Sequence, residues 1–414
     1  MRKVLIVIVI ILLVSTGILY WYSKKQPTST EQPPGATTFF PSDALVAPGS
    51  DLIINDGSTG VQTGQNTSLK FKQLSQSPVA GFSAFTQTLS KTIPSEDPKK
   101  KPTTETVVDR VIRYIARGNG YVYEIRNSTT PLQISNIYIP NVYEGHFADT
   151  NNTAILRFLR DDQRTIATYS VPIPPENQDG TRTQKQGIYL PEKITNLSVY
   201  ADQKQITYLT SDTQNASILS ATSQNTGRKE LLRTPFHEWI IIQSTPKTVW
   251  LQTKAAAIAD GFLYKIDTTD RRLVRVLGNI KGLTTSVSPS GTYILYSQST
   301  STGFITRLLN TKTGVSNNLN IALLPEKCTW LKNEDLICAG NGEMAPGSYP
   351  DMWYSGLVSF KDKFYRIYTT SNTYTILSDG TERAPDATNL QVDENQDIVF
   401  FIDKPTGLLW QLSF

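Results

Sequence analysis

The stretch GLTTSVSPSGTYILYSQSTSTGFITRLLNTKTGV, residues Gly282–Val315, contains three short runs that are rich in Thr, Tyr, Ile and Leu. Turn-forming residues separate these runs, most clearly Ser-Pro-Ser-Gly at Ser288–Gly291. Short runs of β-branched and aromatic residues between such turns are typical of antiparallel strands joined by hairpins. The stretch therefore predicts one small antiparallel sheet.

The same pattern recurs along most of the chain, from Val79 to Phe414. Counting its turns gives about seven units spaced by about 45 residues, and a repeat of this length indicates a propeller or a solenoid. The first unit is expected to be split by a polar insertion, Thr86–Thr106. Further copies span Val142–Pro172, Leu197–Ser223, Trp239–Gly278, Cys328–Ala339 and Leu390–Phe414.

The two ends of the repeat region indicate how it is closed. The last unit stops after its third strand, in Leu408–Phe414, and a strand-like segment, Ser68–Pro78, is left over before the first unit. Radial repetition protects strand edges, whereas a solenoid needs polar capping units, and none is visible in the sequence. We predict an all-β fold for residues 68–414: a single propeller of about seven four-stranded blades, closed by pairing of its N- and C-terminal strands.

The segment VSPSGTYILYS, Val287–Ser297, is similar to the Ser-Pro-Asp-Gly turn and apolar strand of TolB-like and WD40-like (PD40) propeller repeats. Ser290 replaces the acidic residue of that turn, and the Trp-Asp dipeptide of true WD40 blades does not occur. The resemblance covers most of Val79–Phe414 as a pattern and implies the propeller fold. It implies no activity, because this fold hosts many unrelated functions.

Residues 1–25 predict a transmembrane anchor. An uncharged, mostly apolar run, Val4–Tyr20, follows two basic residues and leads into Trp21, Tyr22 and two lysines. About 19 helical residues at about 1.5 Å each span roughly the 30 Å hydrocarbon core. We expect an uncleaved signal anchor with its N-terminus inside, and cleavage near Ser15–Gly17 is the alternative. With this anchor the chain looks like a membrane-anchored, bacterial-type member of the TolB-like group.

Residues 26–67 are rich in Pro, Thr, Ser, Gly and Gln, which predicts a flexible tether. The formal net charge of the chain is only +4, from 40 basic and 36 acidic residues that are dispersed along it. This balance does not favour nucleic-acid binding. The propeller is therefore expected on the extracytoplasmic face of the cytoplasmic membrane, held there by a single membrane-spanning helix.

Cys328 and Cys338 are the only two cysteines of the chain. In the repeat alignment they lie in the first and second strands of one unit, with the turn near Asn333, so antiparallel pairing places them opposite each other. Directly opposed residues have Cα atoms about 4.5–5.5 Å apart, which is compatible with a disulfide. A zinc half-site is the alternative, but it needs further ligands, and His146 and His237 lie in distant units.

No signature for nucleophilic, phosphate-binding or metal-dependent chemistry occurs in the sequence. We therefore expect no cofactor, no metal and no assigned catalytic residue. His146 and His237 are expected near axis-lining strands, where a structural hydrogen-bonding role is commoner than catalysis. A carboxylate pair for glycoside hydrolysis, which needs a separation of about 5–10 Å, has four candidates: Glu144, Asp161, Asp162 and Glu238.

The longest irregular piece within a unit, Gly340–Gly356, clusters aromatic and acidic residues. Aromatic residues on a long loop are typical of recognition surfaces. The candidate ligand-binding residues are Tyr349, Asp351, Trp353 and Tyr354. The alternative is that the rings pack the loop against its own blade.

These observations favour a non-catalytic, membrane-tethered extracytoplasmic propeller that binds an unknown protein or cell-envelope polymer through loops on one face. The alternative is an extracytoplasmic propeller enzyme, glycosidase-like or lyase-like, with carboxylates in the central cleft. Acidic residues that converge near the axis would favour the enzyme, and a mixed rim without them would favour binding.

Overall fold

A computed structural model describes residues 70–93, 103–127, 130–177, 182–199, 204–245, 247–341, 344–393 and 395–414. These residues belong to one compact unit, Thr67–Phe414. Within the described ranges, no helix has the length and apolar character that a membrane crossing requires. The expected anchor, 1–25, and tether, 26–67, lie outside the described residues.

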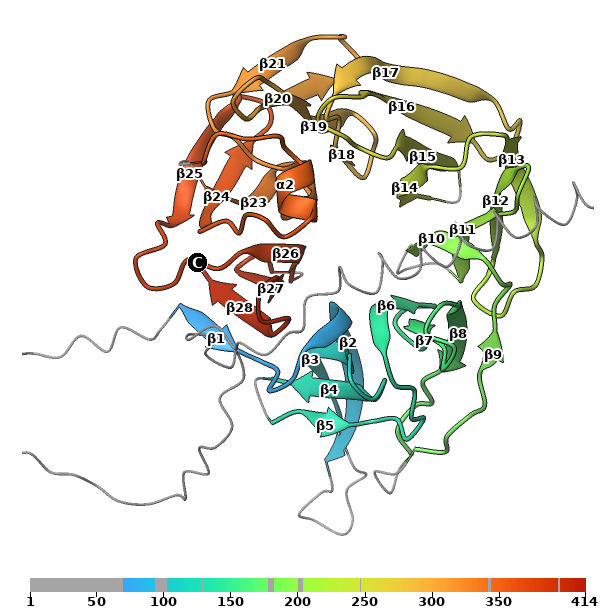
Figure 1. Ribbon diagram of the computed structural model, residues 1–414. Helices are drawn as coiled ribbons and strands as arrows, with labels where there is room; N and C mark the ends of the chain where they lie inside the picture. The colour runs from blue at the N-terminus through green and yellow to red at the C-terminus, as the bar shows by residue number, and fades with distance from the viewer. Residues whose placement is uncertain are drawn as a thin grey trace, which may run out of the picture. The chain divides into compact units, whose positions relative to one another are not determined.

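The described residues form seven four-stranded antiparallel sheets, the blades of a propeller, arranged around a central axis (Figure 1). Blade 1 contains β2 (Val79–Ile93), β3 (Thr103–Ala116), β4 (Val122–Arg126) and β5 (Leu132–Gln133). Blade 2 contains β6 (Val142–Ala148), β7 (Thr153–Leu159), β8 (Ile166–Pro172) and β9 (Ile188–Tyr189). Blade 3 contains β10 (Ile194–Val199), β11 (Gln205–Ser211), β12 (Ala216–Thr222) and β13 (Lys229–Thr234).

Blades 4 to 6 repeat this order, with the first strand of each blade nearest the axis (Figure 1). Blade 4 contains β14 (Trp239–Ser244), β15 (Thr248–Thr253), β16 (Asp260–Asp267) and β17 (Leu273–Lys281). Blade 5 contains β18 (Thr285–Val287), β19 (Tyr293–Ser299), β20 (Phe304–Asn310) and β21 (Ser316–Leu319). Blade 6 contains β22 (Cys328–Trp330), β23 (Leu336–Gly340), β24 (Lys363–Tyr368) and β25 (Thr373–Ser378).

Blade 7 confirms the predicted closure of the ring. Its strands β26 (Ala387–Val392), β27 (Ile398–Asp403) and β28 (Leu409–Ser413) come from the C-terminus, and its outermost strand β1 (Phe71–Gln73) comes from the other end of the repeat region. β1 and β28 are antiparallel, with Phe71 opposite Leu412. The ring is therefore closed by hydrogen bonds between segments that are far apart in the sequence.

The core lies between adjacent blades, where both faces of the middle strands are covered. The strand β27, IVFFID, is buried at every position, because it packs against blades on both sides. At the junction of blades 6 and 7, the rings of Phe364 and Phe401 lie 5.2 Å apart, and Phe71 contacts both. The closing strand is thus held by an aromatic cluster as well as by its backbone.

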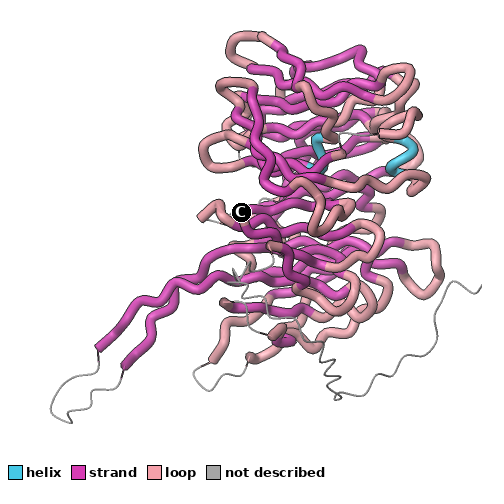
Figure 2. The backbone as a smooth tube through the Cα atoms, turned by 90° about the vertical axis from the view of Figure 1, so that its left-hand side faces the viewer, coloured by secondary structure: helices cyan, strands magenta, loops and turns pink. Residues whose placement is uncertain are grey.

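The polar insertion predicted at Thr86–Thr106 does not interrupt the strands, because its described residues belong to β2 and β3. β2 and β3 continue as a paired two-stranded ribbon, from Thr86 opposite Arg110 to Ile93 opposite Thr103. β4 pairs with β3 only as far as Val111, so the ribbon extends beyond the four-stranded sheet, and Figure 2 shows it projecting from the ring. The segment is polar but rich in threonine, which is β-branched and favours strands. We call this ribbon the arm.

The alternation of strand directions gives the ring two faces. The turns between the first and second strands of each blade lie on the same side as the arm, which we call the arm face. The segments that join one blade to the next lie on the opposite side, which we call the connection face. The short helices η1 (Pro325–Lys327) and α2 (Asp351–Tyr354) belong to loops of the connection face.

Candidate functional site

A pocket of about 690 Å³ lies at the axis on the arm face. Its walls come from the innermost strands of blades 1, 2, 3 and 7, namely β2, β6, β10 and β26. The polar side chains that line it include Ser83, Glu144, His146, Asn151 and Gln391. We call it the axial pocket, and most of its lining residues lie on strands, which hold them in fixed positions.

Two glycines let the walls of the axial pocket approach closely. A Cβ atom at Gly81 would lie 1.8 Å from the carbonyl oxygen of Gly145, so β2 tolerates no side chain at this contact. The backbones of β2 and β6 therefore touch directly. This contact places the side chains of blade 2 beside those of blade 1 at the axis.

Glu144 and His146 lie on the same face of β6, two residues apart, as strand periodicity requires. His146 Nε2 lies 2.7 Å from Glu144 Oε1, and Arg157 from β7 donates to Glu144 Oε2. Burial alone would raise the pKa of Glu144, but the hydrogen bonds from His146 and Arg157 and the positive charge of Arg157 outweigh it and lower that pKa. Glu144 is thus an ionised carboxylate with both oxygens engaged.

Ser83 and Asn151 form a hydrogen-bonded pair in the lining of the axial pocket. Ser83 Oγ donates to Asn151 Oδ1 at 2.7 Å, and Arg113 donates to the carbonyl oxygen of Asn151 at 2.5 Å. Arg113 is itself held by Glu124, with Nε 2.8 Å from Oε2 in a buried ion pair. Burial lowers the pKa of Arg113, and the attraction of Glu124 opposes that effect. The guanidinium that holds Asn151 is therefore paired with a buried carboxylate.

Gln391 links the last blade to the first across the pocket wall. Its Oε1 accepts from the backbone N–H of Ala84 at 3.0 Å, and its Nε2 donates to the carbonyl oxygen of Phe82 at 2.9 Å. The side chain thereby takes the place of a neighbouring strand on the exposed edge of β2. This contact fixes the base of the arm beside the pocket.

The structure brings only one of the four candidate carboxylates to the axial pocket. Glu144 is the sole carboxylate among the described residues that line it. Asp161 and Asp162 follow β7 on the connection face, and Glu238 is an exposed residue that pairs with Lys254 at 3.1 Å. The geometry for two-carboxylate hydrolysis is therefore not present among the described residues of this pocket.

The candidate binding loop Gly340–Gly356 is largely occupied by contacts within the propeller. Tyr349 and Trp353 are buried in one cluster with Phe304 and Phe360, and Trp353 Nε1 donates to Asp386 at 3.1 Å. Tyr354 is 43% exposed. The expected ligand-binding role of the loop stays a prediction, with two of its three rings packed inside.

The same loop spans several blades of the connection face, and Figure 1 shows α2 close to the inner strands of blades 6 and 7. Asp351 accepts from the backbone N–H of Ala257 in blade 4 at 3.0 Å. Ser299 of blade 5 donates to the carbonyl oxygen of Tyr349, and Lys404 of blade 7 donates to that of Trp353. Asp351 is thus a cross-blade contact, which sequence reasoning did not anticipate.

A buried charge cluster lies beneath this loop. Lys327 is fully buried, with Nζ 2.9 Å from Asp362 Oδ2 and 2.5 Å from Asp386 Oδ1. Its ammonium also lies 5.1 Å from the centre of the Trp353 ring. Burial raises the pKa of Asp362 to about 6, although Lys327 opposes the shift. No local pattern in the sequence predicts this cluster, because a lone lysine is normally expected at the surface.

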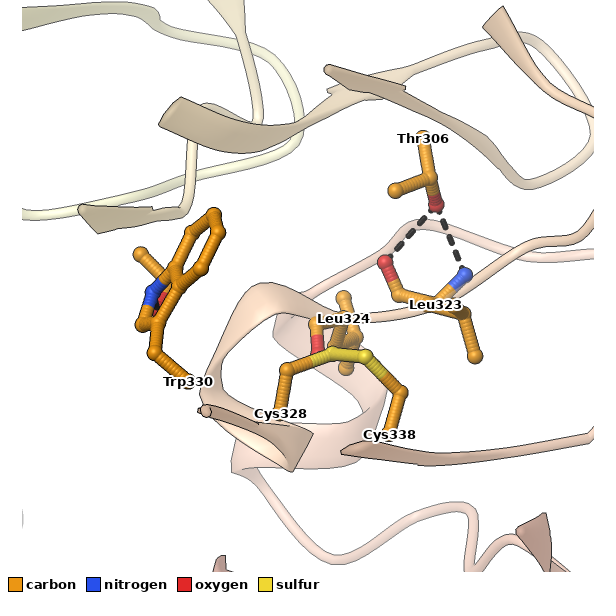
Figure 3. Close-up of a disulfide and its surroundings, with 7 residues drawn as sticks. Thr306, Leu323, Leu324, Cys328, Trp330 and Cys338 are labelled. Atoms are coloured by element: carbon orange, nitrogen blue, oxygen red, sulfur yellow. Dashed lines mark hydrogen bonds between the residues drawn. A yellow bond between two sulfur atoms is a disulfide. The ribbon is translucent and has the colours of Figure 1, made fainter. Parts of the chain in front are cut away.

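The predicted disulfide is confirmed (Figure 3). Cys328 of β22 lies directly opposite Cys338 of β23, with Cα atoms 4.0 Å apart, slightly closer than expected. It lies at the junction with blade 5, where Thr306 exchanges two hydrogen bonds with the backbone of Leu323. The disulfide therefore crosslinks the two strands of one hairpin at an interface between blades.

No family model matches the sequence, and no curated protein matches it either. Solved structures that resemble the chain include an oligogalacturonate lyase from Vibrio parahaemolyticus, with a TM-score of 0.50 and 10% identity over 84% of this chain and 94% of that one. They also include TolB from Acinetobacter baumannii, with a TM-score of 0.40 and 11% identity over 80% of each chain.

A virginiamycin B lyase from Staphylococcus aureus has a TM-score of 0.44 and 9% identity over 81% of this chain and 100% of that one. At such identities the comparison bears on the fold alone. In its described residues the chain is a seven-bladed β-propeller, and TolB and other propeller proteins are among its structural neighbours.

Proposed function

We propose that the protein is a non-catalytic propeller, tethered to the cytoplasmic membrane and displayed on its extracytoplasmic face, that binds a protein or cell-envelope polymer on one face of the ring. The observation that carries this proposal is the axial pocket, in which the one carboxylate, Glu144, has both oxygens engaged by Arg157 and His146. Such a site offers fixed hydrogen-bonding groups without a free acid and base pair.

The position of the arm supports binding of a partner larger than the axial pocket. β2 forms one wall of the pocket at Ala80–Phe85 and then continues into the arm. A ligand that enters the pocket and extends beyond it would meet the arm next. Exposed strand edges also bind extended segments through backbone hydrogen bonds.

The disulfide supports the extracytoplasmic location. Disulfides persist in oxidising compartments and are rare where thiols are kept reduced. The apolar segment at residues 1–25 and the tether at 26–67 would hold the propeller outside the membrane. Protease added to intact spheroplasts should degrade the propeller, and protection of the propeller would contradict this location.

Binding on the arm face can be tested with a photo-crosslinking amino acid. Benzophenone inserts into C–H bonds of proteins and polysaccharides, so it captures either class of partner. We expect a probe at Thr88, an exposed residue of the arm, to capture a partner that a probe at the outer residue Tyr374 does not. Ser83→Val, which removes a hydroxyl from the lining of the axial pocket, should reduce the capture at Thr88. Equal capture at both positions would refute the proposal.

A lyase-like enzyme is a second candidate, and the His146–Glu144 pair favours it. Among the described residues, the His146 imidazole forms a hydrogen bond only with Glu144, through Nε2. Its other ring nitrogen, Nδ1, can therefore contact a ligand. An imidazole oriented by a carboxylate is suited to act as a general base.

Oligogalacturonate, the substrate named for one structure of the same fold, is a practical first probe for this alternative. We expect no unsaturated product from it. Formation of an unsaturated product that disappears in His146→Gln would replace the binding proposal with an enzyme.

A further inference from the structure

A second cavity, of about 470 Å³, lies between blades 1 and 2 on the connection face. It is built from the segment that leads from β5 into β6, the turn after β7 and the end of β9. It shares no lining residue with the axial pocket. Its volume falls within the range of about 300–1,000 Å³ that is typical of ligand sites.

Two tyrosines line this cavity and are largely uncovered. Tyr138 is 63% exposed and Tyr189 is 61% exposed. Each packs against one neighbouring ring: Tyr138 against Tyr121 at 6.1 Å and Tyr189 against Tyr169 at 5.0 Å. Rings that are held in place but still exposed lose little conformational entropy when a ligand covers them.

Charged groups with defined roles adjoin these rings. Asp162 accepts a hydrogen bond from the Thr165 hydroxyl and from the backbone N–H groups of Thr165 and Arg164, the last two at 2.8 and 2.9 Å. Together these hydrogen bonds lower the pKa of Asp162 to about 2. The carboxylate of Asp162 is therefore already engaged by hydrogen bonds within its own turn. Asp161, the next exposed carboxylate, has no hydrogen-bond partner among the described residues and is available to a ligand.

Arg160 completes the cavity beside Tyr189. Its guanidinium lies 5.8 Å from the centre of the Tyr189 ring, and its Nη1 lies 3.8 Å from Glu192 Oε1, which is too long for a hydrogen bond. This loose ion pair with Glu192 uses none of the guanidinium N–H groups in a hydrogen bond, so they can donate to a ligand. The cavity thus combines two exposed tyrosine rings, the guanidinium of Arg160 as a hydrogen-bond donor, and the carboxylate of Asp161 as an acceptor.

We propose that this cavity binds an uncharged saccharide chain. The C–H faces of a pyranose would cover the rings of Tyr138 and Tyr189, while its hydroxyls would donate to Asp161 and accept from Arg160. Two carboxylates against one guanidinium disfavour an anionic sugar. This proposal rests on the proposed function, because it takes a cell-envelope polymer as the partner of the propeller. It assigns that polymer a binding site separate from the axial pocket.

A proline-rich peptide is the main competing occupant, because aromatic-lined grooves also bind polyproline helices. The free carboxylate of Asp161 favours the saccharide, since it accepts hydrogen bonds from hydroxyl groups and a proline has no backbone N–H to donate. The test below separates the two.

The full chain in detergent micelles can be titrated with maltohexaose, cellohexaose and N-acetylchitohexaose by isothermal calorimetry. We expect at least one of them to bind, with an affinity reduced about tenfold in each of Tyr138→Ala and Tyr189→Ala. Asp161→Asn should reduce it less. Tyr374→Ala is the matched control: Tyr374 is an exposed tyrosine, 5.7 Å from Tyr365, outside the cavity, and its loss should change nothing.

Three outcomes would overturn the proposal. One is failure of all three oligosaccharides to bind, and another is binding that both tyrosine variants leave unchanged. The third is binding of an octaproline peptide, in place of any sugar, that Tyr138→Ala weakens. Unchanged melting temperatures in the variants would show that the fold is intact. None of these outcomes bears on the axial pocket, which the Ser83 and His146 variants test separately.

Discussion

Lys327 Nζ lies 2.9 Å from Asp362 Oδ2, and both side chains are completely buried. Asp386 completes the cluster and also accepts from the indole N–H of Trp353. Lys327 ends η1 of blade 6, Asp386 precedes β26 of blade 7, and Trp353 lies on the loop across them. The contact between Lys327 and Asp386 therefore joins blade 6 to blade 7, and Trp353 ties the covering loop to the same cluster.

Replacing Lys327 with methionine should destabilise the propeller by about 3–5 kcal/mol, because it leaves two buried carboxylates without a counter-charge. The loss should be smaller at pH 5 than at pH 8, since burial has already raised the pKa of Asp362 to about 6 and a protonated carboxyl needs no partner. Urea unfolding of both proteins at the two pH values measures this change in the free energy of unfolding. The control is Lys254→Met, which removes an exposed partner of Glu238 and should cost less than about 1 kcal/mol.

The closing strand gives a second prediction. Phe71→Ala should destabilise the ring by about 3–5 kcal/mol, because Phe71 is buried and packs edge-on against Phe364 and Phe401. Lys70→Ala, one residue earlier and exposed, should have little effect. Hydrogen exchange of β28 should accelerate in Phe71→Ala alone, and equal exchange in the two variants would mean that β1 does not hold the ring closed.

Removing the disulfide should have a limited effect. The double variant Cys328→Ala and Cys338→Ala should lose about 2–3 kcal/mol, since the bond closes a loop of sequence separation 10 and constrains the unfolded chain only there. The opposed strands β22 and β23 keep their backbone pairing, so the circular dichroism spectrum should not change. Complete unfolding of the double variant would show that the bond holds more than one hairpin.

The features that the sequence predicted are those with a local or periodic signal. The blade repeat follows from short apolar runs between turns, as in Ser288–Gly291, and the register of Cys328 with Cys338 follows from a turn of known position. The closing strand was predictable because the last unit lacked its fourth strand. In each case the signal lies in residue order alone.

The features that the sequence did not predict depend on residues that meet only in the fold. Lys327 contacts Asp386 across 59 residues, and Gln391 contacts Phe82 across 309. Neither pair has a local pattern, because packing of blade 6 on blade 7 brings the first pair together and closure of the ring brings the second pair together. The arm was missed for a different reason: the polar residues of Thr86–Thr106 predicted an insertion between two strands, whereas a projecting ribbon is polar and still continues those strands.

The last prediction concerns Glu326 and the pH dependence of stability. An acid that is paired at the surface stabilises a protein as the pH rises, whereas Glu326 should do the opposite. Burial raises its pKa to about 7, although the hydroxyl of Tyr354 donates to it and Lys327 lies nearby. Because the pKa in the folded state exceeds that in the unfolded state, the folded protein binds the extra proton. Glu326 should therefore lower the stability as the pH rises from about 4.5 to about 7.

Glu326→Gln, which keeps an acceptor for Tyr354, should stabilise the protein at pH 8 by on the order of 2 kcal/mol and change little at pH 4.5. Denaturant midpoints at the two pH values measure the difference. Glu238→Gln, at an exposed glutamate, should leave both midpoints unchanged. If Glu326→Gln destabilises the protein at pH 8, the carboxylate is ionised and favourably paired in the folded state, and burial does not dominate its titration.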